Sequence, residues 1–261
     1  KLYSDYKNKR RTSYRVNRVD NIGSTVDDER KNMYMQLRRV ADYLELLPLT
    51  TISVDGIEAD DAIAYIAKQV LPNSQHFIMS TDTDFLQLID ERIQVWSPTA
   101  KKFYFRQDMQ ERFKLKPENY ILYKSLLGDK SDNIPGIKGL GQKTLEKRLP
   151  ILFGSNTITM DNVIEYAEAN KSEAKVLADV AASRKMLDLN YKLMQLEEVD
   201  IHGGAKESIR NIVERPMQRL DKTEFLKYTL EDQMTIVKNP EFWLRDSFNH
   251  LDVMSSLEQQ K

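Results

Sequence analysis

Seven carboxylates lie in three short clusters along the chain. The clusters are Glu58-Ala59-Asp60-Asp61, Asp82-Thr83-Asp84 and Asp129-Lys130-Ser131-Asp132. Carboxylate oxygens are the ligands that hard divalent cations prefer. A glycine-rich segment, 134–141, follows the third cluster, and glycine-rich turns let the backbone approach a phosphate closely. Clustered acids followed by such a turn indicate a metal-dependent enzyme that acts on nucleic acid.

Each acidic residue taken alone has a simpler explanation, because acids cap helix N-termini and shape turns. The repetition favours metal binding instead. Glu58 leaves a predicted strand, and Asp82 and Asp84 follow another, so both clusters are expected at the carboxyl edge of a parallel sheet. So many negative charges at one edge require cations. Since Mg²⁺ takes few carboxylates per ion, we expect two ions, Mg²⁺ or Mn²⁺, of the kind that clamp an in-line displacement.

Other chemistries fit the chain less well. His76, His202 and His250 lie outside the acidic clusters, which argues against a Ser-His-Asp triad. The chain has no cysteine, which excludes a disulfide scaffold, a zinc-thiolate site and a thiol nucleophile. The glycine-rich turn lacks the Gly-x-x-x-x-Gly-Lys-Ser/Thr spacing of a nucleotide-binding loop. A magnesium phosphotransferase is therefore the weaker alternative.

The composition is that of an ordinary globular protein. The 261 residues are 30% charged and 41% hydrophobic, enough for one large domain or two modest ones. No apolar run approaches the roughly 18 residues of a membrane span. The net charge of -1 results from charges that are unevenly distributed along the chain. Segment 1–18 contains seven basic residues and one acidic residue, Asp5, and segment 138–148 contains four basic residues and one acidic residue, Glu146. Basic patches suit a phosphodiester substrate, although a basic run can also be a solvated face.

The elements that must position these residues follow from hydrophobic periodicity and capping signals. Residues 1–23 suggest a basic helix end and a loop. Strands are predicted at 49–54, 76–80, 93–96 and 102–105, the last two as a hairpin. Helical segments are predicted at 24–47, 59–70, 85–88, 117–128, 142–149, 159–169, 172–188, 205–214, 222–238 and 240–249. Strands that alternate with helices indicate an α/β fold with a parallel sheet and flanking helices, followed by a helical region.

The motifs together resemble the flap endonuclease and 5′-nuclease family. The match covers Glu58-Ala59-Asp60-Asp61, Ser80-Thr81-Asp82-Thr83-Asp84 and 128–136, in residue type, order and spacing. Tyr6-Lys7-Asn8-Lys9-Arg10 resembles the basic segment that opens the helical arch of this family. Trp96-Ser97-Pro98 with Lys101-Lys102 is similar to phage members of the T-even ribonuclease H type.

The resemblance implies a fold and a task. Residues 1–115 would form a PIN-like 5′-nuclease core with an arch. Residues 116–261 would form a helical DNA-binding region, with a helix-hairpin-helix (H3TH) motif at about 128–148. The task would be 5′-3′ exonuclease and flap endonuclease cleavage, which removes RNA primers and 5′ flaps in phage DNA replication.

The resemblance also assigns roles to residues. Glu58, Asp60, Asp82 and Asp84 would bind metal, and Asp61, Asp129 and Asp132 would support the second ion. Lys7 and Arg10 would contact the scissile phosphate. The hairpin would bind duplex DNA, with a K⁺ on its carbonyls, through Gly136, Lys138, Gly139, Gly141, Lys143 and Thr144. Expected partners are branched or nicked DNA, RNA–DNA hybrids, a single-stranded DNA-binding protein and a sliding clamp. A cytoplasmic monomer is expected, in the host cell if the chain is phage-encoded.

One departure qualifies the expected activity. The family pattern has two further aspartates ahead of the Tyr-Lys-x-x-Arg segment, and this sequence starts at Lys1. We therefore expect leading strands to be missing, weak or no cleavage, and low stability from exposed sheet edges. The alternative function is a structure-specific DNA-binding protein that does not cut.

Overall fold

The computed structural model describes residues 26–235 and 237–258, which form parts of two compact units. The sheet unit comprises 57–201, and the helical unit comprises 26–56 together with 202–258. The basic segment 1–23, with Lys7 and Arg10, lies outside the described residues. No helix in the described ranges is both long enough and apolar enough to span a membrane.

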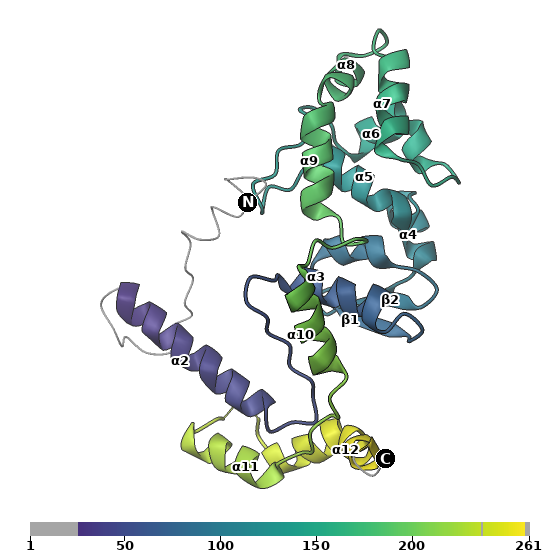
Figure 1. Cartoon of the computed structure of the whole chain (residues 1–261). Helices are drawn as coiled ribbons and strands as arrows, with labels where there is room; N and C mark the ends of the chain where they lie inside the picture. The colour runs from purple at the N-terminus through teal and green to yellow at the C-terminus, as the bar shows by residue number, and fades with distance from the viewer. Residues whose placement is uncertain (1–25, 236, 259–261) are drawn as a thin grey trace. The chain divides into compact units, whose positions relative to one another are not determined.

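The sheet unit contains a three-stranded sheet, with helices before β1, between β1 and β2, and after β3 (Figure 1). Its N-terminal half contains α3 (Ala59–Tyr65), the π-helix η1 (Ile66–Val70), β1 (His76–Met79), the 3-10 helix η2 (Thr83–Leu88), β2 (Ile93–Ser97), β3 (Lys102–Tyr104) and α4 (Arg106–Phe113). Its C-terminal half contains α5 (Pro117–Leu127), α6 (Gln142–Arg148), the 3-10 helix η3 (Pro150–Phe153), α7 (Met160–Ala169), α8 (Lys175–Ala182) and α9 (Arg184–Met194).

The sheet has the order β1-β2-β3. Strands β1 and β2 run parallel, with His76 opposite Ile93 and Ile78 opposite Val95. Strands β2 and β3 form the predicted hairpin, with Val95 opposite Tyr104. Ile78, Ile93, Val95 and Tyr104 are buried, so one face of this mixed sheet contributes to the core.

The other face of the sheet carries large apolar side chains. Phe77 and Met79 alternate with the buried Ile78 and are 59% and 72% exposed. The ring centroid of Phe103 lies 5.8 Å from that of Phe77 and 4.8 Å from that of Trp96. A continuous aromatic strip therefore crosses all three strands on this face.

Helix α5 connects the sheet half of this unit to its helical half. It contacts both η2 and α9, and Tyr120, Leu122 and Leu126 are buried in it. Pro117 occupies its first turn, where the missing N–H costs nothing. Gly128 ends it with a φ of 71°, a conformation that glycine adopts without strain. The loop after α5 therefore begins at a defined residue and direction.

The helical unit contains α2 (Val26–Leu44), α10 (Gly203–Val213), α11 (Lys222–Glu231) and α12 (Pro240–Glu258). Its core consists of Tyr43, Leu47, Phe225 and Leu244. The ring of Trp243 on α12 stacks on Phe225 at a centroid distance of 5.8 Å. Residues far apart in the sequence thus share one small apolar core.

Polar contacts hold the end of α2 against α11 and the segment before it. The Gln218 amide donates to the carbonyl oxygens of Leu44 at 3.3 Å and Leu47 at 2.7 Å. Arg39 pairs with Asp232 at 2.7 Å. The Gln218 amide thus adds a second donor to two carbonyl groups that already accept from backbone N–H groups, and the ion pair links α2 to the segment after α11.

The predicted α/β class with a following helical region is confirmed, with local corrections, among them a predicted helix 222–238 that ends at Glu231. The predicted strand 49–54 is wrong, because this segment pairs with no strand in the described part of the chain. The predicted helix 172–188 is two helices, broken where the Ser183 hydroxyl donates to the Asp179 carbonyl at 2.6 Å. Helix α4 was not predicted; the Asp108 carboxylate caps it by accepting from the Phe105 N–H at 2.9 Å.

Candidate metal and nucleic-acid site

Two of the predicted acidic clusters meet at one lysine. The Nζ of Lys124, on α5, lies 2.8 Å from Asp84 Oδ1 and 2.8 Å from Asp129 Oδ2. Burial lowers the pKa of Lys124, but the two carboxylates more than offset this and raise it above its ordinary value. The lysine therefore stays charged and joins the second cluster to the third.

Asp84 is buried to a degree that Lys124 only partly offsets. Its side chain is only 16% exposed. Burial raises the pKa of Asp84, Lys124 opposes this in part, and the charges of Asp82 and Asp129 raise it further. An additional cation would stabilise the ionised carboxylate, which is the property expected of a metal ligand.

Asp82 serves as a cap and still faces the site. It is the N-cap of η2, and its Oδ1 accepts from the Asp84 N–H at 2.9 Å. Its own N–H donates to the Ser80 hydroxyl at 3.0 Å. The capping explanation and the metal explanation are therefore compatible here, because capping engages one of the two carboxylate oxygens.

Asp129 organises the loop after α5. Its Oδ1 accepts from the Ser131 N–H at 2.7 Å, the Ser131 hydroxyl at 2.6 Å and the Asp132 N–H at 3.3 Å. Burial would raise the pKa of Asp129, but hydrogen bonds from Lys124 and Ser131 outweigh it and hold the pKa at about 2. Asp132, in the same loop, is buried with 9% exposure.

The first cluster lies at the start of α3. Glu58 precedes the helix in an extended conformation, and the Asp60 carboxylate accepts from the Asp61 N–H at 3.1 Å. Helix α3 contacts η2. Within 26–235 and 237–258, no group of three or more acidic or histidine side chains is arranged to hold a metal ion. The structure thus joins Asp84 and Asp129 through Lys124 but does not gather the seven predicted ligands into one cage.

The hairpin between α5 and α6 is closed by two glycines. A Cβ on Gly136 would lie 1.9 Å from the Leu127 carbonyl oxygen, and one on Gly128 would lie 2.4 Å from the Gly136 nitrogen. Asp129 and Ile134 exchange backbone hydrogen bonds of 2.9 and 2.7 Å across the loop. Only glycine permits this close approach of the two backbone segments.

The tip of the hairpin is open and basic. Gly139, with a φ of 82°, and Gly141 have no heavy atom within 4 Å of where a Cβ would lie. Lys138 and Lys143 are exposed, and Thr144 lies in the first turn of α6. The predicted DNA-contacting residues after Gly136 therefore surround backbone that another molecule can approach.

A buried asparagine fixes the hairpin to α9. Asn190, 1% exposed, donates to the Ser125 carbonyl at 3.0 Å and the Pro135 carbonyl at 2.7 Å. Ile121, Ile134 and Met194 form the apolar cluster beneath the loop. The hairpin is thus held by both polar and apolar contacts.

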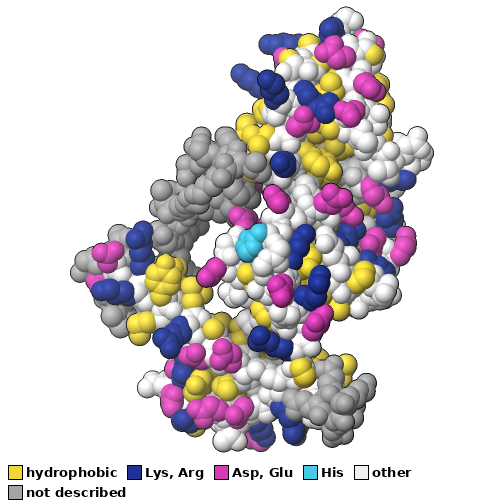
Figure 2. Space-filling view, in the orientation of Figure 1, with side chains coloured by type: hydrophobic (Ala, Val, Ile, Leu, Met, Phe, Trp, Pro, Cys, Tyr) yellow, Lys and Arg dark blue, Asp and Glu magenta, His cyan; other side chains and the backbone are white. Residues whose placement is uncertain are grey.

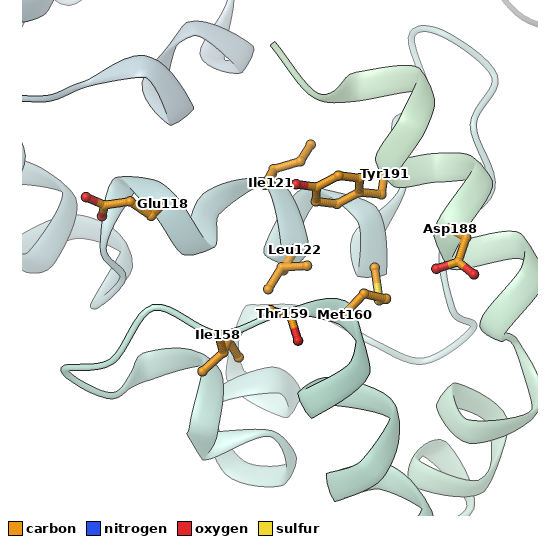
Figure 3. Close-up of a pocket in the computed structure, with 8 residues that line it drawn as sticks. All are labelled: Glu118, Ile121, Leu122, Ile158, Thr159, Met160, Asp188 and Tyr191. Atoms are coloured by element: carbon orange, nitrogen blue, oxygen red, sulfur yellow. The ribbon is translucent and has the colours of Figure 1, made fainter. Parts of the chain in front are cut away.

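Outside the acidic clusters, the charge pattern of the described residues and the cavity near α5 show no second group of unpaired acids. Basic and acidic side chains are interspersed over the face in Figure 2. A cavity of about 320 Å³ lies among α5, α7 and α9, with Leu122 and Met160 in its lining (Figure 3). Its acids are ion-paired, Glu118 with Arg106 and Asp188 with Arg184, each at 2.7 Å.

Sequence reasoning missed Lys124 and Asn190. Lys124 is a lysine within the largely apolar run of α5, one turn before the third acidic cluster. Asn190 is a polar residue on the inward face of α9. A buried polar group requires a partner, so each position was a usable signal, although neither identifies the partner.

Family models place the whole described sheet unit in one family. The N-terminal resolvase-like domain of 5′-3′ exonucleases matches residues 1–114, and their C-terminal SAM fold matches residues 115–214. The chain belongs to the 5′-3′ exonuclease family.

Two relatives show how the chain compares in length. A thermostable DNA polymerase I of Thermus thermophilus is 30% identical over 188 residues, which cover 69% of this chain and 22% of that protein. A 5′-3′ exonuclease of Aquifex aeolicus is 28% identical over 235 residues, covering 87% of this chain and 72% of that protein. The chain thus spans about a fifth of the length of the polymerases that it matches.

Solved structures share the fold. The bacteriophage T5 5′-exonuclease with bound divalent zinc has a TM-score of 0.64 and 22% identity, covering 82% of this chain and 78% of that one. The bacteriophage T5 flap endonuclease in a pseudo-enzyme–product complex with DNA and metal ions has a TM-score of 0.62 and 22% identity, covering 82% and 79%.

Proposed function

We propose that the chain is a divalent-metal-dependent nuclease that hydrolyses phosphodiester bonds of DNA or RNA–DNA, as a 5′-3′ exonuclease and at 5′ flaps. The observation that carries this proposal is the convergence of Asp84 and Asp129 on Lys124, each at 2.8 Å, next to a glycine hairpin. Membership of the 5′-3′ exonuclease family supports it.

The donor chemistry suits two Mg²⁺ or Mn²⁺ ions. Asp84 is a buried carboxylate with negative neighbours, and hard divalent cations bind such oxygens. When bound, the ions would stabilise the charge that develops on the scissile phosphate. The residues proposed to hold them are Glu58, Asp60, Asp61, Asp82, Asp84, Asp129 and Asp132.

The other residues would position the substrate. Lys124 would keep Asp84 and Asp129 ionised and at a fixed separation. Gly139 and Gly141 would let duplex phosphates approach the hairpin backbone, with K⁺ on its carbonyls, and Lys138 and Lys143 would add charge. Lys7 and Arg10, outside the described residues, are proposed to contact the scissile phosphate.

The proposed biological role is removal of RNA primers and 5′ flaps in DNA replication, in a phage-infected cell. The DNA polymerase I relatives support a replication role. Branched or nicked DNA would be the substrate, and a single-stranded DNA-binding protein and a sliding clamp would be partners.

Asp82→Asn tests the proposal with a matched control. Asparagine keeps the N-cap of η2 but removes a metal-binding charge. We expect Mg²⁺-dependent cleavage of a 5′-flap substrate to fall by about 100-fold or more. Asp221→Asn replaces another N-cap aspartate, which accepts from the Glu224 N–H in the helical unit, and should cleave like the parent. Parent-like cleavage by Asp82→Asn would contradict the proposal.

A structure-specific DNA-binding protein without cleavage activity is the second candidate. It is favoured by the lack of a three-ligand metal group among the described residues. In that case the parent binds flap DNA with steep salt dependence but releases no product with Mg²⁺ or Mn²⁺, and Asp82→Asn binds as tightly as the parent.

A further inference from the structure

A second cavity opens beside the carboxyl end of β1, on the side of Asp82 that faces β2 and β3. Its volume is about 320 Å³, at the lower end of the range for small-ligand sites. The lining includes Ser80 and Asp82 after β1, Ser97 at the end of β2, Thr99 in the turn after it, Tyr104 and Arg112. Its polar groups are therefore several hydroxyls, one guanidinium and the Asp82 carboxylate.

Arg112 is available for an anion. Its Nη1 donates to the Tyr104 hydroxyl at 2.6 Å, and its guanidinium lies 5.0 Å from the centroid of the Phe113 ring. Among the ion pairs of the described residues, none includes Arg112, whereas Arg106 on the same helix pairs with Glu118 at 2.7 Å. A guanidinium has five N–H donors in a planar fork that matches a phosphate.

The serine hydroxyl oxygens of the cavity already accept hydrogen bonds from the backbone. Ser80 Oγ accepts from the Asp82 N–H at 3.0 Å, and Ser97 Oγ accepts from the Ala100 N–H at 3.2 Å. Thr99 Oγ1 lies 3.3 Å from Ser97 Oγ. Because the serine oxygens accept from backbone N–H groups, the Ser80 hydroxyl hydrogen and one of the two hydroxyl hydrogens of the Ser97–Thr99 pair are available to a ligand that accepts hydrogen bonds.

The cavity does not suit a base. Tyr104 is its aromatic lining residue, and that side chain is buried, with Lys102 Nζ 4.6 Å and the Arg112 guanidinium 5.5 Å from the ring centroid. A base would need an open ring face for stacking. A sugar-phosphate needs donors, which this cavity offers.

We propose that this cavity binds a phosphate of the strand being cut, adjacent to the scissile phosphodiester, with Arg112 as its principal ligand. The proposal rests on the nuclease function proposed above, because Asp82 belongs to both the cavity and the proposed metal site. The phosphate is either the terminal 5′-phosphate or an internal phosphodiester, and the two share the same recognition chemistry.

Binding measurements with modified DNA separate these sources. Flap substrates would carry a 5′-phosphate, a 5′-hydroxyl, or one neutral methylphosphonate at successive positions of the cut strand. Affinity would be measured by fluorescence anisotropy with Ca²⁺ in place of Mg²⁺, so that cleavage is not the readout. In the parent, we expect one neutralised position to weaken binding by about tenfold or more, as for a charge-assisted hydrogen bond.

Arg112→Gln should lose that sensitivity. It should bind the unmodified substrate about tenfold more weakly than the parent, and the critical neutralised position should then change its affinity little. Arg106→Gln, an equal charge change on the same helix outside the cavity, should retain the parental sensitivity. Arg112→Lys keeps the charge but not the planar fork, and its affinity for the unmodified substrate should lie between those of the parent and Arg112→Gln. Thermal melting of each variant checks that it is folded.

The outcomes separate this inference from the proposed function. Sensitivity confined to the 5′-terminal group identifies a terminal phosphate, and sensitivity at an internal position identifies a phosphodiester. If the parent binds flap DNA but no neutralised position loses its effect on affinity in Arg112→Gln, the cavity proposal is overturned while the nuclease proposal stands. If the parent binds no flap DNA, both are overturned.

Discussion

Gly136→Ala is expected to disrupt the hairpin more than alanine substitution of either glycine at its tip, Gly139 or Gly141. The new Cβ would lie 1.9 Å from the Leu127 carbonyl oxygen and 2.8 Å from the Gly128 nitrogen. Van der Waals contact requires about 3.5 Å, so the two backbone segments must separate by more than about 1 Å.

That separation breaks identifiable hydrogen bonds. The Ile137 N–H donates to the Leu126 carbonyl at 2.9 Å, and Asp129 and Ile134 exchange bonds of 2.9 and 2.7 Å. At about 1 kcal/mol for each, the loss is about 3 kcal/mol. For a unit of this size, this corresponds to a fall in melting temperature of roughly 6–12 °C.

Thermal melting followed by far-UV circular dichroism measures the effect, and two other glycines are its controls. Gly139→Ala meets no atom, but its φ of 82° costs about 1–2 kcal/mol for a residue with a Cβ. Gly141→Ala meets no atom at a φ of -137°, so its stability should change by less than about 0.5 kcal/mol. The destabilisation should decrease in the order Gly136, Gly139, Gly141. A Gly136→Ala protein that melts within about 2 °C of the parent would refute this reasoning.

Two further predictions concern the residues around the hairpin. The pKa of Asp129, about 2 against an ordinary 3.8, contributes stability that is present above pH 3.8 and lost as the pH falls toward 2. In Lys124→Met, carboxyl NMR titration should find this pKa clearly raised, because the ion pair and its hydrogen bond are lost. A value still near 2 would contradict the role of Lys124. Asn190→Ala leaves the buried Ser125 carbonyl and the Pro135 carbonyl without their donor. Urea denaturation should therefore show a free energy of unfolding lower by about 3 kcal/mol. A decrease under about 1 kcal/mol would show that water replaces the amide.

Elements with strong local signals were predictable from the sequence. Strand β1 alternates between exposed Phe77 and buried Ile78 within an apolar run, and Pro117 marks the first turn of α5. The segment 49–54 has equally good strand composition but no partner strand among the described residues. Strand formation depends on a neighbour as well as on composition, so composition alone gave the wrong result there.

The candidate site was predictable in its residue types but not in its contacts. The acids of 82–84 and 129–132 were identified as a group from spacing. Their connection through Lys124 depends on α5 lying beside η2, a tertiary contact that no local pattern encodes. The same holds for Asn190, whose acceptors Ser125 and Pro135 are more than fifty residues earlier in the chain.

The two tryptophans of the chain offer a separate spectroscopic probe of each compact unit. Trp96 lies on the aromatic strip of the sheet unit, 4.8 Å from Phe103, and Trp243 stacks on Phe225 in the helical unit at 5.8 Å. Replacing either one with phenylalanine leaves a single tryptophan, which excitation at the long-wavelength edge of its absorption band selects over the tyrosines. Intrinsic fluorescence of the two variants would then report whether the units unfold together or at different denaturant concentrations.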